Sequence, residues 1–257
     1  MNHLLSITSS CLMLLCIVSC EKNKQLEEGK KIQLTKITTE WGFLSYTYDA
    51  SGKLTMEEYV SDDDAHKTIY DNYGSLGELL GFTIVYEKGD ETDLRCENIY
   101  DGAGRLIKMN KYDLGTGVLL SYCTIEYGDG AIIRRQYNPP ATLWGTDEYI
   151  LTADKKNIAK YLFYLGTSTT PNTTITYGEY DDKTNPNTLL PPGYSPERMV
   201  LSQNNPLSSV WLTASMPPDM EISYLYSYEY NGNGCPVKFS TASELRNSNV
   251  FYEYNVD

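Results

Sequence analysis

Few residues in this chain of 257 could perform catalysis. His3 and His66 are its two histidines, and a single histidine in the body of the chain cannot build a multi-histidine metal site or a two-histidine relay. His66 follows three aspartates, 62–64, but the Asp-x-Asp-x-Asp-Gly spacing of a calcium loop is missing. We expect a solvated turn there, and we predict no metal site, no cofactor and no catalytic residue.

Carboxylates are the one catalytic residue type that is abundant, with 34 Asp and Glu. Two of them about 5–10 Å apart in a cleft would suit a carboxylate-dependent glycoside hydrolase or another cell-envelope hydrolase. Cys-x-x-Cys, His-Glu-x-x-His, Gly-x-Ser-x-Gly and phosphate-loop motifs are absent from the sequence. A hydrolase is therefore the alternative, and a protein that is not an enzyme is the first hypothesis.

Three tryptophans are the candidate ligand-binding residues: Trp41, Trp144 and Trp211. An exposed indole beside Asn and Asp can stack on a sugar or grip a protein partner. Packing in the core, or anchoring of a loop, is the competing interpretation for each of them.

The net charge is −13, and such a surface repels a nucleic-acid backbone, so nucleic acid is not an expected partner. The 23 tyrosines against 5 phenylalanines indicate sheet faces that are partly wet, because each hydroxyl needs a partner or water.

The first 19 residues read as a signal peptide, because an apolar stretch of about 15 residues is too short to span a bilayer comfortably. The segment ends in "IVSC", which resembles a bacterial lipobox and implies a lipid on Cys20. Residues 20–31 are polar and charged, as in a flexible tether, and 32–257 form a single β-repeat domain. An ordinary secretory signal cut nearby is the alternative.

The main sequence pattern is a repeated turn, written "YTYDASGKL" from Tyr46, "IYDNYGSL" ending at Leu76 and "NIYDGAGRL" ending at Leu106. The aspartate can bond the backbone two residues ahead, and the last glycine can adopt a positive φ. Each copy therefore predicts a hairpin. For the third copy the expected register sets Tyr100 opposite Arg105 and Glu97 opposite Lys108.

The whole chain predicts an all-β antiparallel meander of about 13–15 strands in a curled or open sheet. A Pro- and Asn-rich insertion, 181–212, interrupts the meander, and its "SPERMVLS" segment predicts one short helix capped by Ser195. A cap over the end of the sheet is the expected role of this insertion. Cys96 and Cys123 fall on strands that flank a third strand, so we predict no disulfide between them.

These hairpins resemble the YD repeats of RHS-type proteins, and more closely a family of YD-repeat-like bacterial lipoproteins. The shared segments are "YDDKTNP" from Tyr180, "LSQNNP" from Leu201 and "YSYEYNGNGCP" from Tyr226. The resemblance covers most of the chain and implies a β-hairpin fold at the cell envelope, and it is silent on activity.

The predicted function is an extracytoplasmic lipoprotein held on a membrane, with the outer membrane as the expected location, and with a non-enzymatic binding or scaffold role. Its predicted partners are the membrane itself, through the lipid, and an envelope protein or a glycan. Repeated strands would offer a broad face on which rows of tyrosine supply contact area at low entropic cost.

The lipid anchor gives a first prediction. Replacing Cys20 with Ala should release the protein from the membrane fraction, because the thiol that carries the lipid is gone. Fractionation followed by immunoblotting measures this, with Cys16→Ala as the matched control. A Cys20→Ala chain that is still cut and still membrane-bound would contradict the anchor.

Overall fold

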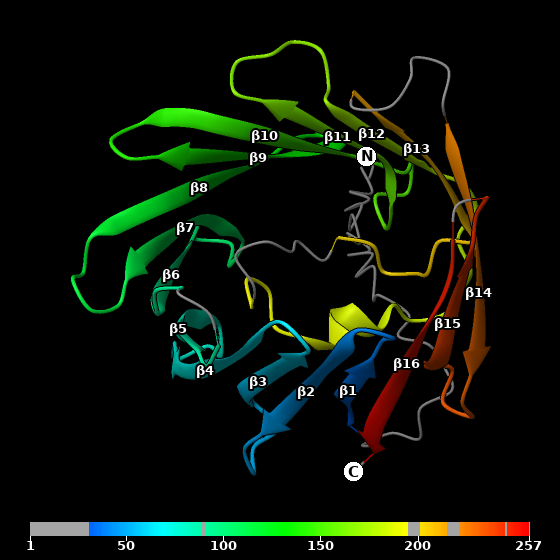
Figure 1. Ribbon diagram of the computed structural model, residues 1–257, viewed down its shortest axis with the longest axis horizontal. Coiled ribbons are helices and arrows are strands. Elements are labelled where there is room, and N and C mark those ends of the chain that lie inside the picture. Colours follow the sequence, from blue (N-terminus) through cyan, green and yellow to red (C-terminus); the bar gives the residue numbers. More distant parts are fainter. Residues whose placement is uncertain (1–30, 89–90, 195–200, 215–220, 245, 257) are drawn as a thin grey trace, which may run out of the picture.

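The computed structural model describes residues 31–88, 91–194, 201–214, 221–244 and 246–256. Sixteen antiparallel strands, each paired with its neighbours along the chain, close into a barrel (Figure 1). The predicted leader, Cys20 and most of the tether lie outside the described residues.

The strands are β1 (Ile32–Thr38), β2 (Gly42–Tyr48), β3 (Leu54–Ser61), β4 (Ala65–Tyr73), β5 (Leu79–Tyr86), β6 (Leu94–Tyr100), β7 (Leu106–Asp113), β8 (Leu119–Tyr127), β9 (Ala131–Asn138), β10 (Thr142–Leu151), β11 (Ile158–Leu165), β12 (Thr173–Tyr177), β13 (Ser208–Thr213), β14 (Ile222–Tyr230), β15 (Pro236–Ala242) and β16 (Asn247–Val256). A 3₁₀ turn, η1, covers Pro186–Leu189.

The barrel closes where the first strand meets the last. Strands β1 and β16 pair antiparallel from Ile32 opposite Val256 to Thr38 opposite Phe251. The antiparallel meander is confirmed, but the prediction of 13–15 strands in a curled or open sheet is wrong, because these two terminal strands pair with each other. Closure removes both exposed sheet edges.

The turn chemistry predicted for the repeats is confirmed in the first and third copies. The Oδ1 atom of Asp101 accepts the backbone N–H groups two and four residues ahead, each at 2.9 Å. Gly104 has a φ of 75°, which L residues other than glycine rarely adopt. Asp49 and Asn231 accept the same pair of N–H groups in their own turns. Three turns far apart in the chain are thus built alike.

The predicted register of the third hairpin is wrong. Tyr100 pairs with Leu106, and Glu97 pairs with Asn110, because the partners skip one residue after the turn. The same irregularity follows the turns at Tyr48 and Tyr230. A bulge of one residue changes which face each later side chain occupies, so tyrosine and leucine both point inward.

The second copy of the repeat is also placed differently from the prediction. The turn joins Tyr73 to Leu79, with Gly77 at a φ of 87°, whereas Tyr70 lies within β4. Leu76, predicted as the repeat leucine, is 93% exposed at the turn. This copy is therefore displaced by three residues from the predicted motif.

Tyrosines link successive turns at the end of the barrel where the repeat turns lie, which we name the repeat end. Each hydroxyl donates to a backbone carbonyl at or near the start of the preceding odd-numbered strand. Seven such bonds, 2.6–3.0 Å long, are Tyr48–Leu34, Tyr73–Leu54, Tyr100–Leu79, Tyr127–Leu106, Tyr180–Ile158, Tyr228–Pro206 and Tyr254–Pro236.

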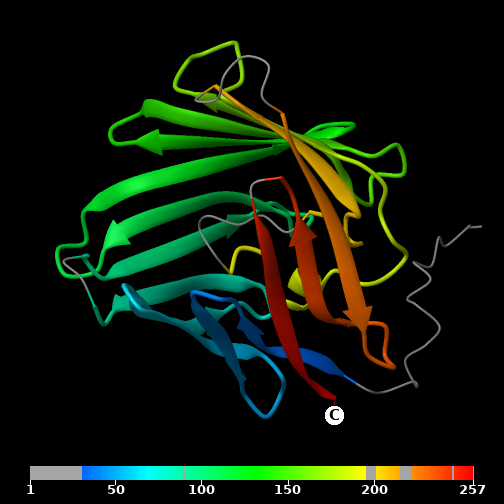
Figure 2. The same ribbon diagram turned by 45° about the vertical axis from the view of Figure 1, so that its right-hand side comes forward.

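The segment between β12 and β13 is named the insertion here, and its described residues, 178–194 and 201–207, lie inside the ring of strands (Figures 1 and 2). It is bonded to opposite parts of the wall: Tyr70 and Asn98 donate to its backbone at 3.0 and 3.1 Å, and Gln203 donates to Lys156 at 2.9 Å. At Gly193 a Cβ atom would come within 2.8 Å of Asn98, so the close approach requires glycine.

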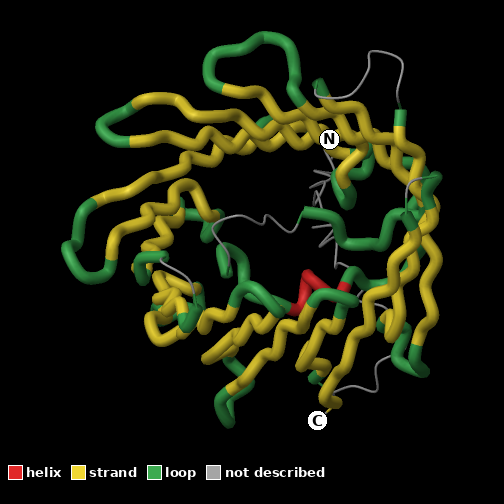
Figure 3. Tube along the Cα trace, viewed as in Figure 1, coloured by secondary structure: helices red, strands yellow, loops and turns green. Residues whose placement is uncertain are grey.

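The insertion is therefore an internal plug, and the prediction of a cap over the end of a sheet is wrong. The helix predicted to start at Ser195 lies outside the described residues. Within the described part of the insertion the one helical element is the 3₁₀ turn (Figure 3), whose Asn185 side chain accepts the N–H of Asn187.

Apolar side chains pack between the plug and the wall. One cluster joins Tyr46, Phe82 and Leu94 of the wall to Leu190 and Tyr194 of the insertion. A second cluster lies on the inner faces of β7 to β11; its buried members are Leu106, Met109, Cys123, Ile125, Ile132, Tyr149 and Ile158. The core of this protein is thus the inside of the barrel.

The tyrosine bonds give a second prediction. Tyr127→Phe should lower the free energy of unfolding by about 1 kcal/mol, because it leaves the Leu106 carbonyl without its donor. Urea denaturation followed by circular dichroism measures this. The matched control is Tyr137→Phe on the outer face of β9, whose ring stacks on Tyr122. Equal effects of the two substitutions would contradict the linking role.

Candidate functional site

The outer face of the wall is charged. Residues that alternate with the buried positions along each strand point outward, and several of them form ion pairs. The outward pairs are Lys36–Glu253 (4.0 Å), Glu58–Lys67 (3.5 Å), Arg95–Glu97 (3.3 Å), Glu126–Arg135 (2.5 Å) and Glu229–Lys238 (2.9 Å). They are spread around the barrel, and exposed apolar side chains such as Ile99, Leu225 and Phe251 lie among them on the outer face.

The interior contains a cavity of about 530 Å³ between the insertion and the strands β9 to β12. Its walls combine tyrosine rings, aliphatic side chains and asparagine amides. The lining residues are Arg134, Asp147, Tyr149, Ile158, Tyr161, Ile175, Tyr177, Tyr180, Asn185, Asn187, Tyr194, Leu201, Ser202 and Pro206.

A buried ion pair stands in the wall of this cavity. Asp147 is 2% exposed and accepts from Arg134 at 2.9 Å, from Gln136 at 2.8 Å and from the Tyr161 hydroxyl at 2.7 Å. The carboxylate oxygens of Asp147 are engaged by these donors. Asp147 therefore stabilises the wall and is poorly placed to act as a free base.

The tyrosines near this pair are held in their neutral form. Burial, followed by the negative charge of Asp147, raises the pKa of Tyr161. Burial also raises the pKa of Tyr149, to about 12, although Arg134 acts in the opposite direction. The cavity therefore presents neutral hydroxyl groups at ordinary pH.

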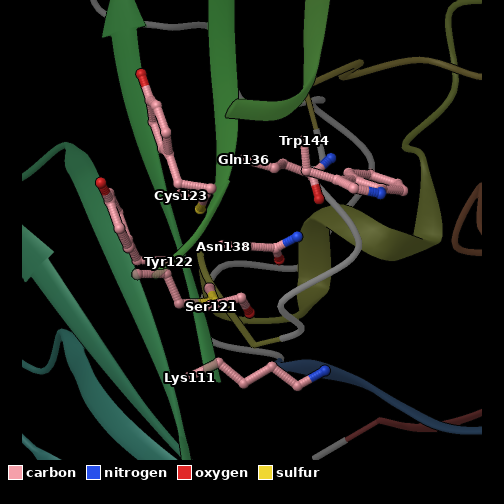
Figure 4. Close-up of a pocket in the computed structure, with 9 residues that line it drawn as sticks. Lys111, Ser121, Tyr122, Cys123, Gln136, Asn138 and Trp144 are labelled. Atoms are coloured by element: carbon pink, nitrogen blue, oxygen red, sulfur yellow. The ribbon is translucent and has the colours of Figure 1, made fainter. Parts of the chain in front are cut away.

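A second cavity, of about 260 Å³, lies along β7 to β10, toward the end of the barrel that is opposite the repeat end. Figure 4 shows Lys111, Asn138 and Trp144 extending to one side of the wall, whereas Tyr122 points to the other side. Gln136 lines this cavity and bonds Asp147 of the first cavity, so the two are neighbours along the wall. The first cavity lies in the lumen, and the side chains of Lys111, Asn138 and Trp144 place the second cavity beside it.

The three candidate tryptophans lie toward one end of the barrel, opposite the repeat end; we name it the tryptophan end. Trp41 lies in the turn between β1 and β2, Trp144 near the start of β10, and Trp211 near the end of β13. In an up-and-down barrel these three positions share an end. The sequence identified the residues, and the fold brings them to a common rim.

Trp144 and Trp211 face the lumen, and Trp41 belongs to the rim. The Trp144 ring lies 5.7 Å from Phe163, and Trp211 lies 5.3 Å from Tyr224 and donates to Ser209 at 2.7 Å. Trp41 carries the guanidinium of Arg246 4.0 Å above its ring. Trp41 thus ties two rim turns together, as the competing interpretation of a loop anchor proposed.

Sequence reasoning missed Lys111, Gln136, Asn138 and the pair of Arg134 with Asp147. One signal was available for the pair, since both lie near the Pro-Pro turn that joins β9 to β10 and face each other across it. None was available for Lys111, because its inward direction depends on barrel closure.

The aspartates 62–64 form the turn between β3 and β4, where the backbone N–H of Ser61 donates to the Asp64 carbonyl at 2.8 Å. The described residues contain no cluster of three or more metal-binding side chains.

The strand order β6–β7–β8 used in the disulfide argument is confirmed, and Cys96 and Cys123 are free thiols. Burial raises the pKa of Cys96 to about 12.

No helix among the described residues is long and apolar enough to cross a membrane.

Comparison with solved structures gives a likeness of fold. A porin-like protein from Bacteroides vulgatus superimposes with a TM-score of 0.55 at 13% identity, covering 88% of this chain and 99% of that one. A porin-like protein from Bacteroides uniformis covers 88% and 96% at 12% identity, but its TM-score of 0.39 supports no conclusion. No protein-family model and no curated protein matches the chain.

These findings correct the predicted function. A lipoprotein scaffold that displays a broad sheet face, and its alternative, a hydrolase with carboxylates on that face, both assumed an open sheet. The sheet is instead a closed barrel, similar in fold to that of a porin-like protein, and its inner face encloses the plug. Both functional predictions are therefore wrong.

The buried pair gives a third prediction. Asp147→Asn should lower the free energy of unfolding by about 3–5 kcal/mol, because the Arg134 charge stays buried without its carboxylate. The matched control is Glu148→Gln, one residue away on the outer face, with an expected change within about 0.5 kcal/mol. Denaturant titration of both variants measures the difference, and equal losses would contradict the assignment.

Proposed function

We propose that this chain is a porin-like barrel with a water-facing wall, and that it binds a small molecule in its lumen through the tryptophan end. The observation that carries the proposal is the pair of lumenal tryptophans near one end, with a cavity of mixed polar and apolar lining beside Trp144 and a plug toward the other end. The proposal is non-enzymatic, and the carboxylate of Asp147 in the cavity wall is already bound by three donors.

The charged residues on the outer face support the proposal that the strands face water and not lipid. Membrane-spanning barrels carry an apolar band about 25 Å tall outside and polar residues inside. This barrel departs from that order, since several ion pairs lie on its outer face and its two apolar clusters lie inside. Each Lys or Arg at the midplane of a bilayer would cost about 2–4 kcal/mol.

The plug favours binding of a solute in the lumen over passage of the solute through the barrel. The insertion is bonded to β4 and β6 on one side and to the turn between β10 and β11 on another, so it crosses the lumen. Tyr228 of β14 also donates to Pro206 of the insertion at 2.9 Å. A solute that enters at the tryptophan end would therefore meet the insertion before it reached the other end of the barrel.

A second candidate function is a channel in the outer membrane, which the porin-like fold favours. The cell envelope is the proposed location under either function, supported by that fold and by the leader-like segment before Cys20. The two functions differ in whether the wall contacts water or lipid, and that difference can be measured.

The fourth prediction tests these functions directly. Residues 31–257, expressed without the leader and purified without detergent, should remain soluble and should not float with liposomes. A Trp41→Phe, Trp211→Phe variant keeps Trp144 as its single indole. Its fluorescence should change saturably with at least one member of a panel of neutral and acidic mono- and disaccharides.

The matched control adds Trp144→Phe to that variant and places the single indole back at position 41. It should bind without a fluorescence change or lose affinity. Flotation with liposomes together with stepwise conductance in a planar bilayer would establish the channel instead. A soluble barrel that responds to no member of the panel would contradict lumenal binding of this class of molecule.

A further inference from the structure

We infer that the cavity beside Trp144 selects an acidic saccharide of one or two rings, with Lys111 receiving its carboxylate. This inference rests on the proposed function and names its ligand class. It starts from the residues that line the cavity: Met109, Lys111, Ser121, Tyr122, Cys123, Gln136, Tyr137, Asn138 and Trp144.

The charge of this lining is unusual for the chain. Acidic residues outnumber basic ones by 34 to 21 overall, yet the lining contains one lysine and no Asp or Glu. Asp147, the nearest lumenal carboxylate along β10, is occupied by three donors. The cavity therefore offers a positive charge that the described residues around it do not neutralise.

Lys111 faces the lumen by register. It lies opposite Cys96 on one side and Ser121 on the other, and Cys96 is 1% exposed in the core. Among the described residues no ion pair involves Lys111. Asp113, two residues along the same face, instead accepts from Thr116 at 2.6 Å within its own turn. The ammonium group of Lys111 is thus available to an anion from outside.

The remaining lining matches a sugar better than a flat apolar acid. Ser121, Gln136 and Asn138 supply a hydroxyl and two amides, which pair with hydroxyl groups. Trp144 is 47% exposed, so part of its indole face is open to the C–H face of a pyranose ring. The volume of about 260 Å³ is near the lower limit for ligand pockets, which fits one or two rings.

The test compares digalacturonate with its methyl ester, which keeps both rings and removes the charges. Isothermal titration calorimetry on residues 31–257 should give digalacturonate an affinity about tenfold higher, as expected for a charge-assisted hydrogen bond. Lys111→Met should abolish this preference and leave binding of the ester unchanged, whereas Lys111→Arg should retain most of it. Trp144→Ala should weaken both ligands about tenfold.

Lys108→Met is the matched control, because Lys108 lies on the same strand with its side chain outside, 5.0 Å from the Tyr122 ring. It should leave the preference intact, and circular dichroism verifies the fold of each variant. Equal affinity for acid and ester would overturn the inference and leave the proposed function standing. Binding of neither probe would also overturn it, while the wider saccharide panel decides the proposed function.

Discussion

The pairing of β1 with β16 is the constraint on which the rest of this structure depends. It joins the two ends of a meander and creates an inside and an outside from a sheet that would otherwise have two similar faces. The inside then receives the apolar clusters, the plug and the buried pair of Arg134 with Asp147, and the outside receives ion pairs such as Glu58–Lys67. Without this pairing, Lys111 and Trp144 would lie on an open face and would line no lumen.

The sequence repeat builds the single hairpins from which the closed barrel is assembled. In each regular copy the Asp or Asn closes the turn, the glycine adopts the positive φ, and the tyrosine bonds the start of the strand before it. The turn chemistry was predictable, because it depends on neighbours within five residues. The register was not, because the bulge after each turn shifts Tyr100 and its partners by one residue.

The candidate site, like the register, could be predicted only in part from the sequence. Trp144 and Trp211 could be selected from the sequence by residue type, since exposed indoles often contact ligands. Their common end, and the inward direction of Lys111, follow from strand order and barrel closure. The plug was recognised as an irregular segment, 181–212, but the residues of the wall that it contacts, Tyr70 and Asn98, lie 124 and 95 residues from their partners in sequence. Contacts of that range are set by the assembled fold.

Amide hydrogen exchange of residues 31–257 in detergent-free buffer tests the central claim, a closed barrel in water, most directly. The account predicts that the amides of β1 and β16 are protected comparably to those of β7, because all three strands are paired on both sides. Rapid exchange along one side of β1 and β16, with β7 still protected, would reveal two free sheet edges. That result would contradict the closed barrel and the lumen with it.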